Sequence, residues 1–310
     1  MSIFKKKKPG EPDSRIVVLR KPEPGTCGGT TATQDTKAPK EILSTDMRLF
    51  EAESALSDCV RDRTEDTIGF FSAYAAPAGE GSFLFLETRE YRRGGRQDSR
   101  WALVKENVMP ALVSLAAELN LAKNNGFHSK THGLPENFGG SVNIVYGSGE
   151  RISFSNNQSP IVSVETGKRI VDLFRKAMAG ENIPLPDPSG LKEIRFSEER
   201  SNGGYTRASL TFLEDGTGVN RKTSRYDGPA VYESEKPVEA ETVDAIRKCI
   251  SETALFAWGD LPQSGYGFEN KFLTFVFKDG KELTVQGNKA TPGRIRNGFF
   301  NVELEMTTKH

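Results

Sequence analysis

Two histidines are the first side chains whose type and spacing could do chemistry. His128 and His132 lie four residues apart in the stretch GFHSKTHGLPENFGG, whose glycines predict a loop. A four-residue spacing brings two ligands to one face only in a helix, so this spacing does not indicate a metal site. We expect both histidines to form local hydrogen bonds, and we retain them as candidate ligand-binding residues.

The stretch REYRRGGRQDSR at residues 89–100 holds five arginines and is followed by Trp101. Planar guanidinium groups suit phosphate contacts, and aromatic rings suit stacking on bases. The same composition is also typical of a solvated connection between two strands. Arg92, Arg93, Arg96 and Trp101 are therefore candidates for binding nucleic acid or a phosphorylated ligand.

A glycine- and aromatic-rich stretch, GDLPQSGYGFEN at residues 259–270, follows Trp258. Loops on a rigid scaffold often carry binding residues, although many are simple connections. Trp258 and Tyr266 complete the set of candidate ligand-binding residues.

Catalytic motifs are missing from the sequence. It contains no P-loop, GxSxG, HExxH or EF-hand pattern. The carboxylates are numerous, but no pair can be placed together, so no catalytic residue is assigned. The scattered cysteines Cys27, Cys59 and Cys249 include no CxxC pair, which indicates reduced thiols and neither a disulfide framework nor a zinc site. We expect no cofactor and no metal.

Residues 1–43 are predicted to form a disordered basic tail. They carry nine basic and five acidic residues, whereas the whole chain has a net charge of zero. The four lysines at residues 5–8 indicate either a solvated tail or attachment to RNA or anionic membrane. No apolar run approaches the roughly 20 residues that span a bilayer, and the N-terminus does not resemble a secretory signal, so we expect a cytoplasmic protein.

Apolar periodicity and turn residues predict most elements of the chain. Residues 44–60 fit either a strand or a short helix. The predicted strands are 68–74, 82–88, 101–105, 193–200, 205–214 and 229–233, with hairpins at 141–157 and 272–288. The predicted helices are 107–123, with Asn107 as a candidate cap, 165–178 and 238–255. A loop is expected around Arg221, Lys222 and Arg225, and the alternation of Phe300, Val302, Leu304 and Met306 favours a final strand.

The two hairpins belong to a longer correspondence between positions 131 residues apart. Apolar residues coincide without a gap from Leu112 and Val243 through Phe154 and Val285. We therefore predict an α+β protein with two tandem related domains, each a small antiparallel sheet with one or two helices packed on one face. The predicted bounds are 44–179 for the first domain with its leading segment, 180–190 for a Pro-rich linker, and 191–310 for the second domain.

The second hairpin and its surroundings also carry a family resemblance. A Trp near a helix end, followed by FxFxxxFKDGKxLxVxGNxxxP, resembles a domain of uncharacterised proteins from anaerobic Clostridia-type bacteria. The matching residues are Trp258, Asp279, Gly280, Gly287, Asn288 and Pro292. The first half departs from this pattern, because Phe127 replaces the Trp and Ser148 replaces the turn Asp. The resemblance covers most of the chain, and it implies no activity.

These observations favour a non-catalytic interaction protein with a composite surface from two repeated domains and a protein partner. An alternative is an RNA- or membrane-associated protein that uses the lysine tail and the arginine stretch. A second alternative is an enzyme with a site between the domains, near Arg92, Arg96, His128 and His132.

Overall fold

The structure is a computed structural model with a mixed α+β fold built on two sheets. It describes residues 16–20, 29–56, 68–90, 95–133, 138–200, 202–226, 228–253, 255–258, 271–287 and 293–307. By their contacts the residues group into two compact units. The first comprises Met1–Tyr74, Leu86–Arg100 and Val108–Arg175, and the second comprises Ala75–Phe85, Trp101–Asn107 and Lys176–His310.

The first sheet has nine strands in the order β1-β2-β7-β9-β8-β3-β4-β5-β6. Its strands are β1 (Ile16–Arg20), β2 (Thr30–Asp35), β3 (Met47–Ala55), β4 (Ile68–Ala78), β5 (Gly81–Glu90), β6 (Gln97–Val104), β7 (Phe127–Thr131), β8 (Gly140–Tyr146) and β9 (Arg151–Asn156). The predicted strands at 68–74, 82–88 and 101–105 and the hairpin at 141–157 are confirmed. The segment 44–60, left open between strand and helix, forms β3 where it is described.

Two helices cover the apolar face of the central strands in the first sheet, α1 (Met109–Glu118) and α2 (Val164–Met178). The fully buried Phe50 of β3 lies against Phe174 of α2, with ring centroids 6.0 Å apart. The Ser163 side chain accepts a hydrogen bond from the Thr166 backbone at 3.1 Å and so caps α2. The expectation that Asn107 caps α1 is wrong, because Val108 occupies the cap position without a side-chain bond.

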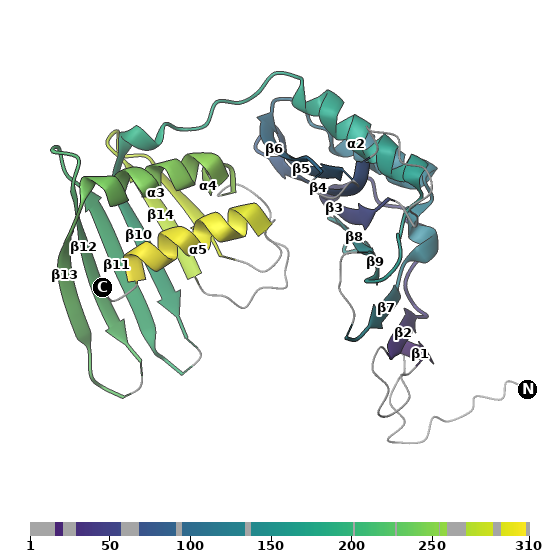
Figure 1. Cartoon of the computed structure of the whole chain (residues 1–310), viewed down its shortest axis with the longest axis horizontal. Helices are drawn as coiled ribbons and strands as arrows, with labels where there is room; N and C mark the ends of the chain where they lie inside the picture. The colour runs from purple at the N-terminus through teal and green to yellow at the C-terminus, as the bar shows by residue number, and fades with distance from the viewer. Residues whose placement is uncertain are drawn as a thin grey trace, which may run out of the picture. The chain divides into compact units, whose positions relative to one another are not determined.

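The second sheet has six strands in the order β13-β12-β11-β10-β14-β15. They are β10 (Leu191–Glu199), β11 (Tyr205–Phe212), β12 (Gly218–Arg225), β13 (Tyr232–Val238), β14 (Lys271–Phe277) and β15 (Glu282–Gln286). Its helices are α3 (Ala240–Thr253), the short α4 (Leu255–Trp258) and α5 (Gly293–Thr307). Figure 1 shows α3 and α5 side by side across one face of this sheet. Phe256 of α4 packs edge-on against the buried Phe275 at 5.0 Å.

Six strands of the first sheet, β6-β5-β4-β3-β8-β9, follow the same chain order across the sheet as β13-β12-β11-β10-β14-β15. Strands β8 and β14 begin and end 131 residues apart, at the spacing expected from the sequence. Both hairpins turn through a glycine with a φ of +87°, Gly149 and Gly280. In each turn the side chain before the glycine accepts a bond from the residue after it, Ser148 from Glu150 at 3.2 Å and Asp279 from Lys281 at 2.9 Å.

Further expectations about secondary structure are also wrong in the described residues. Residues 16–20 and 30–35 of the expected disordered tail form β1 and β2, because β2 pairs with β7 and thereby joins the sheet. The loop expected around Arg221, Lys222 and Arg225 is the strand β12, because residues 218–225 pair with β11 on one side and β13 on the other. The expected final strand is the helix α5, which buries Phe299, Val302 and Met306.

Candidate functional site

A hollow of about 600 Å³ lies on the face of the first sheet opposite α1 and α2. Its charged lining residues are Glu53, Arg89, Glu90 and Lys130. Its hydroxyl and amide lining residues are Ser129, Ser141, Ser155, Asn156 and Asn157. Side chains that alternate away from the buried Val142 and Ile144 must lie on this face, which is why β3, β8 and β9 contribute polar groups here. The hollow therefore offers both signs of charge together with several hydrogen-bonding groups.

Two adjacent glycines, Gly139 and Gly140, form one edge of the hollow, where the main chain carries no side chains. A Cβ atom on Gly140 would lie 2.1 Å from the carbonyl oxygen of Glu53. A Cβ atom on Gly139 would lie 1.8 Å from the carbonyl oxygen of Asn156. Because both obstacles are backbone atoms, only glycine lets β8 begin this close to its two neighbouring strands.

The charged groups of the hollow are held in defined positions. The guanidinium of Arg89 lies 4.9 Å from the centroid of the Phe70 ring and 2.6 Å from a carboxylate oxygen of Glu87. Ser141 donates a hydrogen bond to Glu53 at 3.2 Å. The Glu90 carboxylate accepts a hydrogen bond from the Arg96 backbone N–H at 3.0 Å. This bond joins two residues of the arginine stretch at 89–100 beside the hollow.

Strand β7 borders the hollow and is attached to β9 by a short parallel ladder and by asparagine side chains at both ends of that ladder. Its backbone pairs with β9 in parallel only at residues 128 and 129. At one end, Asn157 accepts a bond from the Thr131 N–H at 2.8 Å and donates to the Thr131 carbonyl at 2.9 Å. At the other end, the buried Asn125 accepts from the Ser153 N–H at 2.7 Å and donates to the Arg151 carbonyl at 2.7 Å. These side chains therefore extend the short ladder at both of its ends, beside the backbone bonds from Gly126 to Ser153 and from Asn157 to Ser129.

His128 of β7 lies beside the hollow, with its Nδ1 2.9 Å from the hydroxyl of the lining residue Ser155. Partial burial lowers the pKa of His128, and the nearby Arg151 guanidinium lowers it further. The imidazole is therefore neutral at pH 7, so one ring nitrogen can accept a proton or a hydrogen bond.

Deeper on the same face, a polar chain joins three strands. Asn143 of β8 donates to the Glu51 carboxylate at 3.2 Å and accepts from Arg151 Nε at 2.9 Å. Burial raises the pKa of Glu51, and the neighbouring Glu53 carboxylate adds to that rise. Burial also raises the pKa of Tyr74, as does the Glu51 charge. These hydrogen bonds fix the positions of the side chains next to the hollow.

The structure brings only part of the predicted site together. His128 lies beside the hollow on β7, so the expected loop is a strand there. The Arg96 backbone N–H bonds the lining residue Glu90. His132 donates its backbone N–H to the Gly29 carbonyl at 3.1 Å, and Trp101 is half-buried on β6. Arg92, Arg93 and Tyr266 lie outside the described residues, as does the side chain of Trp258 on α4. Sequence reasoning missed the serines and asparagines of β8 and β9, although their alternation with apolar residues was visible.

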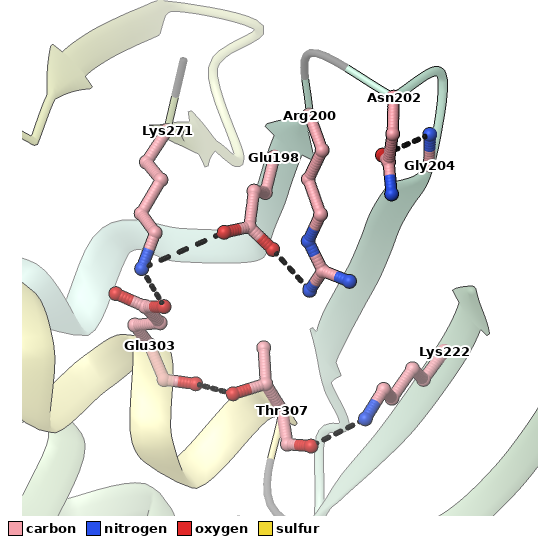
Figure 2. A network of polar contacts seen from close by, with 8 residues as sticks. All are labelled: Glu198, Arg200, Asn202, Gly204, Lys222, Lys271, Glu303 and Thr307. Carbon is pink, nitrogen blue, oxygen red and sulfur yellow. Dashed lines mark hydrogen bonds and ion pairs between the residues drawn. The ribbon is translucent and has the colours of Figure 1, made fainter. Parts of the chain in front are cut away.

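A second polar cluster lies on the helix-covered face of the second sheet (Figure 2). Lys271 of β14 contacts Glu303 of α5 at 2.7 Å and Glu198 of β10 at 3.8 Å. Glu198 also pairs with Arg200 at 2.8 Å. The Lys271, Glu198 and Glu303 side chains are only about one fifth exposed or less, at 21%, 19% and 15%. The cluster therefore ties α5 to the sheet.

The end of α5 is fixed by strand β12. Asn220 donates to the Met306 carbonyl at 3.0 Å, and Lys222 donates to the Thr307 carbonyl. These carbonyls have no partner within the helix, so a cation and an amide satisfy them and complement the negative end of the helix dipole.

We expect Lys271→Met to lower the free energy of unfolding by about 2 kcal/mol, because it removes the cation that pairs with the largely buried Glu303 carboxylate, whereas Glu198 keeps Arg200. Urea denaturation measures this change. Adding Glu303→Leu to Lys271→Met should recover part of the loss. An unchanged midpoint for Lys271→Met would show that the cluster does not hold α5.

Among the residues that the structure describes, no group of three His, Cys, Asp or Glu side chains could hold a metal ion. In the same ranges, no helix is both long enough and apolar enough to cross a bilayer. No protein-family model matches the chain, and no curated protein matches it.

Proposed function

We propose that this chain is a cytoplasmic, non-catalytic binding protein and that the hollow on the first sheet is its binding site. The observation that carries the proposal is the lining of the hollow, where cationic, anionic, hydroxyl and amide groups converge around about 600 Å³. Ligand sites commonly have volumes of this order. A lining this polar favours a ligand that carries both signs of charge, and we propose a short polar segment of a protein partner.

We further infer that the six matching strands of the first sheet and the six strands of the second belong to tandem related domains at 44–179 and 191–310, joined by the linker at 180–190. The shared strand order, the 131-residue offset of β8 and β14 and the matching glycine turns support this inference. The glycine edge of the hollow is not repeated in the second sheet. At the 131-residue offset, Gly140 corresponds to Lys271 and Ser141 corresponds to Phe272. Binding at the hollow is therefore assigned to the first sheet alone.

Two serine-to-tryptophan variants test the binding role. Ser141 lines the hollow, whereas Ser153 lies on the same face of the neighbouring strand and does not line it. Wild type, Ser141→Trp and Ser153→Trp would each be used to capture partners from the native organism's lysate. The proposal expects one protein that wild type and Ser153→Trp retain and Ser141→Trp loses, recovered at unchanged mass.

Two results would overturn this proposal. Equal capture by all three proteins would move the binding site away from the hollow. Recovery of the partner in cleaved or otherwise modified form would replace binding with catalysis. Circular dichroism of both variants should match wild type, which confirms that the tryptophans leave the fold intact.

Catalysis at the hollow is a second candidate function, and the contact between His128 and Ser155 is the observation that favours it. A neutral histidine 2.9 Å from a serine hydroxyl can act as its general base. His128→Ala distinguishes the two functions. It should abolish any turnover if catalysis occurs, and it should leave partner capture in place if the protein only binds.

A further inference from the structure

Tyr205 of β11 has two arginine side chains against its ring, on the face of the second sheet opposite α3 and α5. The guanidinium carbons of Arg207 and Arg225 each lie 5.2 Å from the ring centroid. Arg207 is two residues along the same strand, and Arg225 is the cross-strand partner of Tyr205. Alternation along β11 places Tyr205 and Arg207 on the face opposite the buried Ala208 and Leu210, and cross-strand pairing with Tyr205 places Arg225 on that same face.

Other arginines on this face already have carboxylate partners. Arg195 Nε lies 2.9 Å from Glu193, and Arg221 Nε lies 2.8 Å from Glu235. Their charges are therefore compensated within the sheet.

Arg207 and Arg225 differ, because neither forms an ion pair with any residue that the structure describes. Arg225 donates instead to the Gly203 carbonyl at 2.6 Å. The carboxylates closest in register are Glu199, opposite Tyr205 on β10, and Glu233, opposite Thr223 on β13. Two guanidinium groups thus contact one ring, and neither charge is matched by an ion pair in the described part of the chain.

The same face continues as a row of side chains across four strands. Cross-strand pairing aligns Phe272, Ser197, Arg207 and Thr223 in that order. Phe272 is half-buried and Arg207 is exposed, so the row offers an aromatic surface, two hydroxyls and a guanidinium. Aromatic rings on a sheet stack bases, while guanidinium and hydroxyl groups contact phosphates and sugars.

We propose that this row, together with the pair of arginines on Tyr205, is a binding surface for single-stranded nucleic acid. Stacking on the ring orients each guanidinium and leaves N–H groups at its edge for phosphate oxygens. The groups spread over several strands, which matches an extended polyanion better than one phosphorylated side chain. This surface is separate from the hollow on the first sheet, so either proposal can fail without the other.

The test uses the full-length chain and fluorescence anisotropy with a fluorescein-labelled 15-nucleotide single-stranded RNA of mixed sequence, at several salt concentrations. Wild type should bind, and Arg207→Ala/Arg225→Ala should weaken binding at least tenfold and make the salt dependence shallower by one to two released ions. The matched control, Arg195→Ala/Arg221→Ala, removes the same charge from the same face and should change affinity less than threefold. Arg207→Lys/Arg225→Lys should restore only part of the affinity, because it keeps charge without a planar group. Phe272→Ala should also weaken binding if bases stack there.

Several outcomes would overturn the proposal. Wild type that does not bind the RNA would remove it directly. An equal loss in both double-alanine variants would reduce the effect to general charge attraction. Loss of binding only when the four lysines at residues 5–8 become glutamine would assign binding to the N-terminal segment. Displacement of the RNA by equimolar inorganic phosphate would indicate a simple anion site.

Discussion

Asn125→Ala is expected to lower the free energy of unfolding by about 3 kcal/mol, since it removes hydrogen bonds to three partly buried backbone groups. The Asn125 side chain is 3% exposed and bonds the Ser153 N–H and the Arg151 and Pro39 carbonyls, each within 2.9 Å. Its loss leaves the Ser153 N–H and the Arg151 carbonyl of β9 without this partner, next to the residues at which β7 pairs with β9. Urea denaturation followed by circular dichroism measures the change.

The control for Asn125 is its neighbour Asn124, which is exposed at the end of a short 3-10 helix, Leu121–Asn124. Asn124→Ala should change the free energy of unfolding by less than about 0.5 kcal/mol. If Asn125→Ala were as mild as Asn124→Ala, the side chain would not extend the ladder between β7 and β9, and the attachment of β7 beside the hollow would need another explanation.

Phe275→Ala should cost about 3–5 kcal/mol, because it removes a fully buried ring from the core of the second sheet. Phe275 is 0% exposed and packs against Phe256 of α4. The cavity would open between the sheet and its helices, where little can move to fill it. Thermal and urea unfolding of the purified variant measure the loss.

Phe272→Ala is a matched control on the same strand, with the same residue type and the opposite face. Phe272 is only half-buried, so its removal should cost about 1 kcal/mol. Equal losses at positions 272 and 275 would contradict the assignment of the core to the helix-covered face. The small cost also makes Phe272→Ala suitable for the RNA-binding test.

Local turn chemistry made the hairpins predictable from the sequence. Asp279 and Gly280 specify a tight turn between alternating apolar residues, and the structure shows the turn with Gly280 at a φ of +87°. Ser148 was expected to depart from this pattern, yet its hydroxyl accepts the same backbone bond as the aspartate. Such turns depend on a few adjacent residues, so a single sequence reveals them.

Helix α5 shows why an apolar pattern can mislead. Phe300, Val302, Leu304 and Met306 alternate as a strand would, whereas Phe299, Val302 and Met306 have helical spacing. The helix is the observed state, with Phe300 and Leu304 exposed at 39% and 57%. The sequence contains both the two-residue spacing of a strand and the helical spacing of apolar residues. Packing against α3 and the sheet favours the helix.

The candidate site was harder to predict because long-range pairing assembles it. Strand β7 has no apolar alternation, and it is a strand because β2, β9 and the Asn157 side chain supply its partners. The lining residues come from six strands distant in sequence, and most are serine, asparagine or glycine, which carry no motif. His128 and the base of the arginine stretch were identified, but their shared hollow was not.

The most direct test of the binding role is titration calorimetry of the purified captured partner against wild type, Ser141→Trp and Ser153→Trp. If the hollow is the binding site, Ser141→Trp should raise the Kd at least tenfold, because the indole occupies the space of the ligand. Ser153→Trp should leave the Kd unchanged. The same Kd for all three proteins would contradict it and place the partner elsewhere on the chain.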